Sequence, residues 1–170
     1  MLEGKNVNLR IMEKEDLPLW AEWVNNPELY GEYLPLRQRS KTDLEKQYDK
    51  SPPEAKRFFI EKKDGTKVGG IIHFPVGELL EIGYALMPSE RGKGYCSEAV
   101  DVMVDYLFLS KDIVRIQAHT DVRNVASQKL LEKVGFKKEG TVRKSIFIRG
   151  EWRDCYLFSI LRKNGKNQKY

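Results

Sequence analysis

The chain has 170 residues, which is the size of one domain and leaves little room for a second. Its 30 basic residues are interleaved with 25 acidic ones, so the net charge of +5 indicates a mixed-charge surface rather than a nucleic-acid footprint. Two cysteines without a C-x-x-C pair, and only two histidines, argue against a disulfide framework or a zinc site.

The chain also lacks the marks of a secreted or membrane protein. Residues 1–5 form no apolar signal core, and no apolar run reaches the roughly 18 residues of a membrane span. We therefore expect a cytoplasmic protein whose partners are neither membranes nor nucleic acids.

Apolar periodicity and turn residues predict the elements of the first half of the chain. Asp16 is a natural N-cap for a helix that Asn25-Asn26-Pro27 should end, and Asp64-Gly65 is the strongest turn signal. The predicted elements are a strand at 7–11, helices at 16–26 and 42–50, and a hairpin of strands at 57–62 and 67–74.

In the second half, strands and helices alternate before a final pair of strands separated by Arg149-Gly150-Glu151. The predicted elements are strands at 79–87 and 114–119, helices at 97–109 and 125–134, and strands at 142–148 and 156–160. Because a strand-helix-strand crossover joins parallel neighbours, the sheet should be mixed. We expect one domain over 1–161 and a polar tail at 162–170.

The strand at 79–87 leads into the next helix through Arg91-Gly92-Lys93-Gly94-Tyr95-Cys96. Glycines let successive amides converge on one point, and a helix start adds unpaired N–H groups and a positive dipole end. With Arg91 and Lys93 nearby, the loop suits a pyrophosphate, and an ordinary strand-to-helix loop is the alternative. A dinucleotide fingerprint fits less well, because Ser97 replaces its third glycine, and the P-loop pattern is absent.

This loop resembles the coenzyme-A-binding motif Q/R-x-x-G-x-G/A of the GNAT superfamily of N-acetyltransferases, with Arg91 and Gly94 in place and Cys96 where Gly or Ala is usual. Residues 124–136 resemble the N-x-x-S-x-x-L-L-E-K-x-G-F helix of the branch that acetylates the N-termini of ribosomal proteins. Two motifs in the expected order make the resemblance specific. Shorter similarities occur at 81–84 and 150–154.

The resemblance implies a mixed, mostly antiparallel seven-stranded sheet with about four helices. A V-shaped opening should separate the strand at 79–87 from the strand at 114–119, and acetyl-CoA would lie there as cosubstrate, without a metal. An amide near Leu86 could stabilise the oxyanion. The residues expected to bind the cosubstrate are Leu86, Met87, Arg91, Gly92, Lys93, Gly94, Tyr95, Cys96, Ser97 and Asn124.

Two residues are candidates for catalysis. Glu81 lies beside small residues on its strand and could accept the proton of the acceptor, although a salt bridge on the sheet surface is the alternative. Ser127 could contact the pantetheine or the thioester, or bond to a backbone carbonyl one turn back. Some family members carry a tyrosine general acid seven residues after the asparagine, where this chain has Leu131. His119 is a weaker candidate for a base.

The predicted function is transfer of an acetyl group from acetyl-CoA to a primary amine by direct attack. A protein or peptide N-terminal α-amine is favoured, because its pKa of about 7.7–8.0 leaves more of it neutral than a lysine amine. The basic segment 36–41 should also repel spermidine. The alternatives are a small-molecule amine (an aminoglycoside, amino sugar or polyamine) and a non-catalytic CoA-binding module. A homodimer is also considered.

Overall fold

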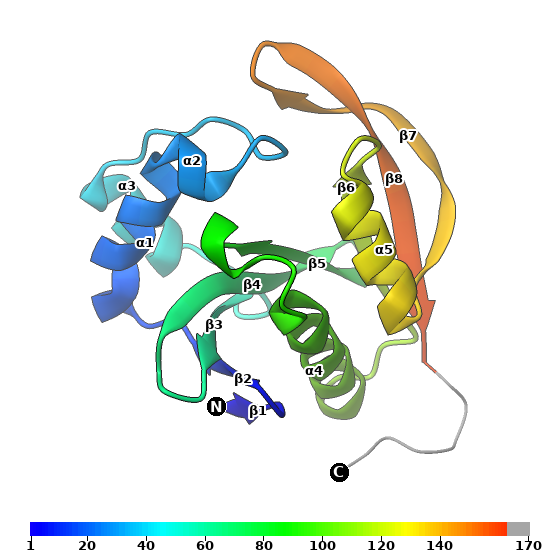
Figure 1. Cartoon of the computed structure of the whole chain (residues 1–170), viewed down its shortest axis with the longest axis horizontal. Coiled ribbons are helices and arrows are strands. Elements are labelled where there is room, and N and C mark those ends of the chain that lie inside the picture. Colours follow the sequence, from blue (N-terminus) through cyan, green and yellow to red (C-terminus); the bar gives the residue numbers. More distant parts are fainter. Residues whose placement is uncertain (163–170) are drawn as a thin grey trace.

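The computed structural model describes residues 1–162, which form one open sheet with helices on both of its faces (Figure 1). Within these residues the strands are β1 (Leu2–Glu3), β2 (Val7–Ile11), β3 (Lys56–Lys62), β4 (Lys67–Val76), β5 (Leu79–Leu86), β6 (Arg115–Asp121), β7 (Lys137–Ile148) and β8 (Glu151–Leu161). The helices are α1 (Leu17–Asn25), α2 (Pro27–Tyr30), α3 (Lys41–Asp49), α4 (Tyr95–Ser110) and α5 (Val125–Val134).

The sheet has the order β1-β2-β3-β4-β5-β6-β8-β7, and among the described strands only β5 and β6 pair in parallel. Their pairing stops after Leu80↔Ile116 and Glu81↔Gln117, whereas β5 stays paired with β4 from Leu79 to Leu86. The two strands therefore diverge beyond Glu81 and split the sheet. The predicted mixed, mostly antiparallel sheet with a V-shaped opening is confirmed.

The counts of strands and helices differ from the prediction, since residues 1–162 contain eight strands and five α-helices. The additional strand, β1, is a two-residue pairing of Leu2 with Leu9. The additional helix, α2, starts where a helix end was predicted. Pro27 occupies its first turn, and the side chain of Asn26 accepts hydrogen bonds from the amides of Glu28 and Leu29.

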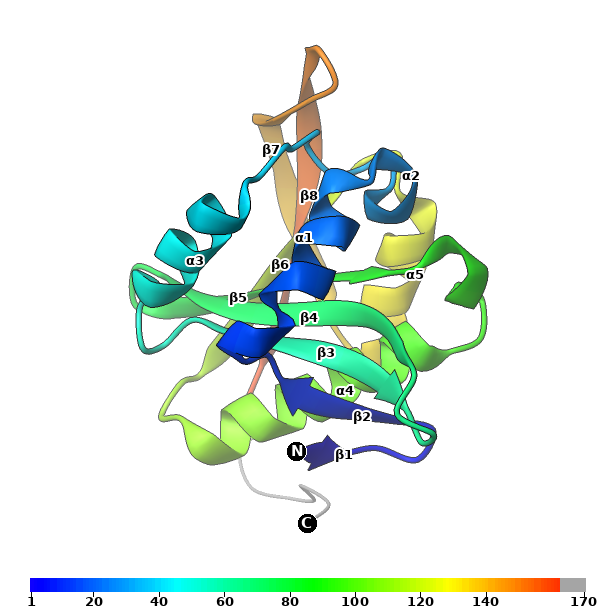
Figure 2. The same ribbon diagram turned by 90° about the vertical axis from the view of Figure 1, so that its left-hand side faces the viewer.

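Each face of the sheet has its own apolar core. The helices α4 and α5 cover one face, where Phe58, Ile71 and Ile82 pack with Met103 and Leu131. The helices α1 and α3 lie over the other face (Figure 2), where Met12, Trp23 and Phe59 form a smaller cluster. Successive strand residues therefore point into different cores.

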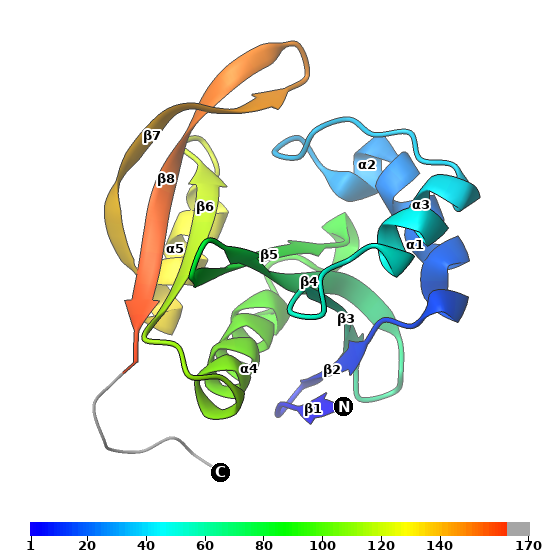
Figure 3. The same ribbon diagram turned by 180° about the vertical axis from the view of Figure 1, so that it is seen from behind.

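The last two strands form a long hairpin whose tip reaches beyond the rest of the sheet (Figure 3). Arg149 and Gly150, both with positive φ, make its two-residue turn. The predicted tail begins with Arg162, whose N–H donates to the carbonyl of Val114, and residues 163–170 lie outside the described part. No helix among the described residues is long and apolar enough to span a membrane.

Candidate active site

A cleft of about 800 Å³ passes through the split between β5 and β6. One end is formed by the loop before α4 and the start of α5, and the other by the chain from α2 to α3 and by the hairpin. Glu81 and Tyr84 both line it but point to opposite faces of the sheet. Tyr84 pairs with Ile71 on the α4 face, and Glu81 pairs with Phe74 on the α1 face.

The loop before α4 presents backbone amides to the cleft. Gly92 and Gly94 both have left-handed backbone angles, with φ of 76° and 84°, which only glycine adopts readily. Within residues 1–162 no side chain caps the start of α4, because the N-cap residue is Gly94, and the Ser97 hydroxyl donates to the carbonyl of Gly94 at 2.8 Å. The amides of the first helical turn are thus available to an anion.

Basic side chains surround this end of the cleft. Arg91, Lys129 and Lys133 line it, and the Nε of Arg91 donates to the carbonyl of Leu86 at 3.3 Å. Open amides beside three cationic side chains fit the pyrophosphate of a coenzyme A, and the unpaired edge of β5 beyond Glu81 fits an extended pantetheine arm.

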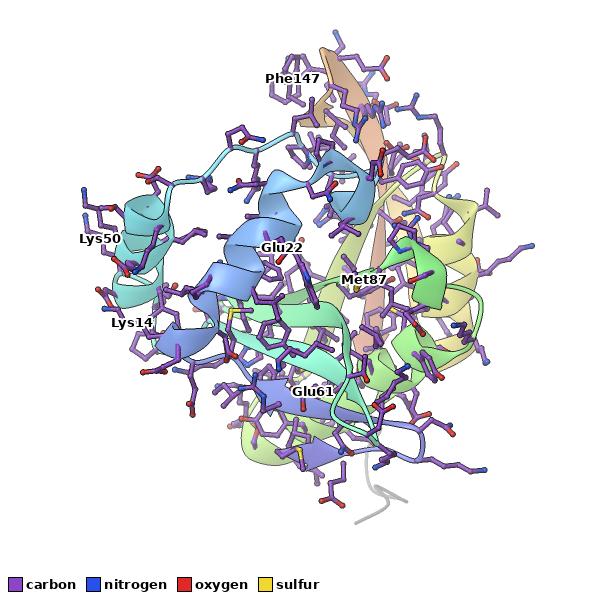
Figure 4. All side chains as sticks on the ribbon, turned by 60° about the vertical axis from the view of Figure 1, so that its left-hand side comes forward. Lys14, Glu22, Lys50, Glu61, Met87 and Phe147 are labelled. Carbon is purple, nitrogen blue, oxygen red and sulfur yellow. The ribbon has the colours of Figure 1, made fainter. Side chains whose placement is uncertain are left out.

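Most of the residues expected to bind the cosubstrate line the cleft, namely Leu86, Arg91, Gly92, Gly94, Cys96, Ser97 and Asn124. Met87, Lys93 and Tyr95 are not among the lining residues. Met87, labelled in Figure 4, donates its N–H to the carbonyl of Val68 and packs its side chain against the cluster of Met12, Trp23 and Phe59. Lys93 pairs with Glu90 at 3.1 Å, and Tyr95 packs against the α4 core.

Glu81 and His119 of β6 form a carboxylate–imidazole pair inside the cleft, which is an ion pair only when the imidazole is protonated. Its Oε1 lies 3.0 Å from Nδ1 of His119, and its Oε2 accepts a hydrogen bond from Nε2 of Gln117 at 2.9 Å. The side chain of His119 is 28% exposed, so its other nitrogen can reach a bound molecule. Hydrogen bonding to Glu81 raises the pKa of His119 above its usual value.

Ser127 bonds to a tyrosine hydroxyl rather than to a backbone carbonyl. Its Oγ lies 2.9 Å from the phenolic oxygen of Tyr84. Asn124 caps α5 as expected, since its Oδ1 accepts the N–H of Ser127 at 3.1 Å. Leu131, at the position where some relatives have a tyrosine, is fully buried in the core. The tyrosine that contacts Ser127 thus comes from β5.

Two arginines of the β7–β8 hairpin join that hairpin to the segment around α2 by hydrogen bonds. Nη2 of Arg149 donates to the carbonyls of Pro27 and Gly31 at 3.3 and 3.2 Å, and Nη1 of Arg153 donates to the carbonyl of Glu32 at 3.1 Å. Arg153 also pairs with the buried carboxylate of Asp121. The sequence shows arginines at these positions, but the carbonyls that they reach lie 118 to 122 residues away and leave no local pattern.

The C-terminal hairpin contributes a buried cysteine to the cleft wall, whereas its exposed tryptophan lies apart from the cleft. Trp152 is 60% exposed and packs edge-to-face on Phe147, and neither lines the cleft. The carboxylate of Asp154 accepts the N–H of Lys144, whereas Cys155 is buried and lines the cleft. The residues described here include no cluster of three or more potential metal ligands.

An open mixed sheet, split beside a glycine loop and an uncapped helix start, has the features expected of an acyl-CoA-binding protein. The family described as the acetyltransferase (GNAT) domain matches residues 6–137, so the chain belongs to the GNAT family and is an acetyl-CoA-dependent N-acetyltransferase. The predicted family and enzyme class are confirmed.

Similar proteins cover nearly the whole chain. The N-acetyltransferase p20 of Bacillus licheniformis is 33% identical over 171 aligned residues, 95% of this chain and 96% of the relative. The spermidine N(1)-acetyltransferase of Vibrio cholerae is 26% identical, covering 97% and 98%. The putative ribosomal N-acetyltransferase YdaF of Bacillus subtilis is 27% identical, covering 99% and 93%, which supports the predicted likeness to the ribosomal branch.

The fold likeness extends to a solved structure. A GNAT-family acetyltransferase from Bacillus anthracis superimposes with a TM-score of 0.79 at 27% identity, over 94% of this chain and 97% of that one.

Proposed function

We propose that the acceptor is a small-molecule primary amine, and that polyamines are the first class to test. The observation that carries this proposal is the bridge across the cleft. Arg149 and Arg153 tie the segment around α2 to the hairpin, and both segments line the cleft, which is therefore enclosed on that side. The names of the spermidine N(1)-acetyltransferase relatives support the same choice over a protein N-terminus.

The pair of Glu81 and His119 supplies the chemistry that an amine acceptor needs. An aliphatic amine with a pKa of about 10 is mostly protonated at neutral pH and must lose a proton before it can attack. With Nδ1 of His119 held by Glu81, the Nε2 nitrogen is left to take that proton. Acetyl-CoA supplies the acetyl group as a thioester. The carboxylate also attracts the cationic form of the amine into the cleft.

The α-amine of a short peptide is the second candidate, and the charge of the cleft favours it. Arg37, Arg39 and Arg57 line the side away from the glycine loop. Guanidinium groups disfavour a polycation and suit an acceptor that carries carboxylates. Arg37 and Arg39 belong to the basic segment expected to contact the acceptor, whereas Lys41 is not a lining residue.

The acceptor classes are separated by comparing kcat/KM for spermidine, aminoglycosides, free lysine, and short acidic peptides with free and blocked N-termini. We expect spermidine or another small amine to react fastest. In Arg37→Gln/Arg39→Gln, turnover of spermidine should rise about tenfold and that of acidic peptides should fall, because two positive charges near the amine are removed.

Lys41→Gln is the matched control, since it removes one charge from the same segment at a position outside the cleft lining. This substitution should leave the turnover of both spermidine and acidic peptides nearly unchanged. Faster turnover of unblocked peptides than of every small amine would reject the small-molecule proposal and favour the second candidate. Absence of turnover with every amine would reject both acceptor classes.

A further inference from the structure

Tyr84 and Ser127 form a hydroxyl pair that the reaction as described above does not use. Tyr84 comes from β5 and Ser127 from the first turn of α5, and their oxygens lie 2.9 Å apart. Both side chains line the cleft on the α4 face of the sheet, opposite the face of Glu81 and His119. The split thus has a proton-accepting pair on one face and a hydroxyl pair on the other.

The chemistry of the two hydroxyls indicates which one donates to the other. A phenol is a stronger donor than an aliphatic hydroxyl, so Tyr84 donates to Oγ of Ser127. Burial raises the pKa of Tyr84, which keeps the phenol protonated. The hydroxyl hydrogen of Ser127 is then free to point into the cleft. A hydroxyl that accepts one hydrogen bond is polarised and donates more strongly to its next partner.

The surroundings hold this pair in one arrangement without adding a charge. Oδ1 of Asn124 accepts the backbone N–H of Ser127 and so fixes that residue, and the ring of Tyr84 packs against the α4 core. The neighbouring ionisable group is the thiol of Cys96, whose pKa burial raises to about 12 despite the nearby Arg91. At neutral pH the site therefore offers a neutral, oriented hydroxyl donor.

We propose that Tyr84 is a positioning residue that aims the Ser127 hydroxyl at the thioester sulfur, so that this hydroxyl stabilises the departing thiolate. The proposal rests on the proposed amine acetylation. The amine lone pair forms the C–N bond, the C–S bond breaks, and its electron pair goes to sulfur. The proton of the amine goes to the pair of Glu81 and His119, and the thiolate takes its proton from solvent after the transfer.

The same arrangement accounts for the leucine in place of a tyrosine on α5. Leu131 fills the core and offers no donor, whereas Tyr84 reaches the cleft from the neighbouring strand. Because its pKa is raised, the phenol is poorly suited to give up a proton itself. It is suited to remain a donor to Ser127, and Ser127 is suited to donate to sulfur.

The first test measures coenzyme A bound to the protein without an acceptor. The ultraviolet absorbance of the thiolate is followed against pH in the wild type, Tyr84→Phe, Ser127→Ala and the control Tyr156→Phe, whose ring lies outside the cleft lining. A hydrogen bond to the thiolate lowers the pKa of the bound thiol. We expect that pKa to rise by roughly one unit in Tyr84→Phe and Ser127→Ala, and to stay constant in the control.

The second test is a kinetic double-mutant cycle with the best acceptor. We expect Ser127→Ala to lower kcat roughly 10- to 100-fold and Tyr84→Phe about tenfold. Because Tyr84 acts through Ser127, adding Tyr84→Phe to Ser127→Ala should cost little more. Thermal unfolding identifies any variant that has lost its fold.

An unchanged thiol pKa in the folded variants, or additive losses in kcat, would overturn the proposed role of Tyr84. The thiol titration requires no acceptor. A wild type that acetylates no amine would therefore refute the proposed function while leaving this first test readable.

Discussion

Glu81 and His119 come from neighbouring strands that pair in parallel only at the point where the sheet splits. The pairing brings the carboxylate and the imidazole together, and the divergence beyond it exposes them to the cleft. An ion pair on the sheet surface was the alternative expected from sequence. The structure places the ion pair within the cleft wall, where it can act on a bound amine.

The pH dependence of acetylation follows from this pair. Because Glu81 raises the pKa of His119, the imidazole gains a proton as pH falls through a value above 6.5 and can no longer accept one. We expect kcat/KM to fall on that acid limb. In Glu81→Gln the contact that raises the pKa of His119 is lost. The fall in kcat/KM should therefore occur at lower pH, and the maximal kcat/KM should decrease about tenfold or more. Rate profiles on spermidine measure both effects.

Glu78→Gln is the control for this profile, since Glu78 is exposed in the turn between β4 and β5. In this variant kcat/KM should fall at the same pH as in the wild type. An acid limb that stays in place in Glu81→Gln would show that another group accepts the proton.

Residues carried by a local motif could be placed beside the cleft from sequence, whereas contacts with distant partners could not be predicted. Arg91, Gly94 and Asn124 lie where the motifs indicate. The partner of Ser127 lies 43 residues away on β5, and that of Glu81 lies on β6. Such contacts depend on strand order and register, which no spacing in the sequence encodes.

At the scale of elements, the junction of β5 and α4 is a left-handed glycine turn followed by open amides. An added side chain at Gly94 would meet no protein atom within 4 Å and would point into space available to the cosubstrate. We expect Gly94→Glu to weaken acetyl-CoA binding at least about tenfold, through bulk and like charge. Titration calorimetry at two salt concentrations would measure the loss and its electrostatic part.

Gly65→Glu is a matched control, because Gly65 has the same φ of 84° and equally open surroundings in the turn between β3 and β4. Both substitutions carry the same backbone strain, so only the Gly94 variant should lose affinity. Equal affinity in the two folded variants would contradict pyrophosphate binding at this loop.

Long periodic elements were predictable, and short ones were not. The strand alternation from Leu79 and the buried face of α4 have enough residues to establish their period. The two-residue β1 and the four-residue α2 are too short for that. The strand β1 depends on the pairing of Leu2 with Leu9, and α2 is a single turn set by the local cap of Asn26 and by Pro27.

At the scale of the whole molecule, stability should depend on pH through His73. The imidazole is 1% exposed and packs against the rings of Phe58 and Tyr106. Burial, together with the charges of Lys111 and Lys56, lowers its pKa from 6.5 to about 4. The folded state therefore resists a proton that the unfolded chain accepts, and the free energy of unfolding should decrease as pH falls from 6.5 towards 4.

We expect this group to account for roughly 3 kcal/mol of that loss, since each unit of difference in pKa between the folded and unfolded states is worth about 1.4 kcal/mol. Urea unfolding of the wild type and of His73→Phe, compared at several pH values, measures it, since the variant keeps an aromatic ring but has no proton to gain. If the free energy of unfolding falls equally with pH in the two proteins, groups other than His73 cause the loss of stability in acid.

Two expectations about the whole molecule stay predictions. A cytoplasmic location is one. Self-association is the other, and the exposed ring of Phe147 at the hairpin (Figure 4), which packs on the exposed Trp152, is a surface on which to test it. Sedimentation at several protein concentrations would measure it.

The bridge across the cleft joins segments that leave the ribosome at very different times. Arg149 reaches carbonyls 122 and 118 residues earlier in the chain, and Arg153 reaches one 121 residues earlier. The glycine loop, in contrast, belongs to the single stretch from β5 to α4. Since contacts between distant segments close only after both have been synthesised, enclosure of the acceptor side waits for the final hairpin. The two ends of one cleft therefore mature in sequence, the glycine loop before the enclosure.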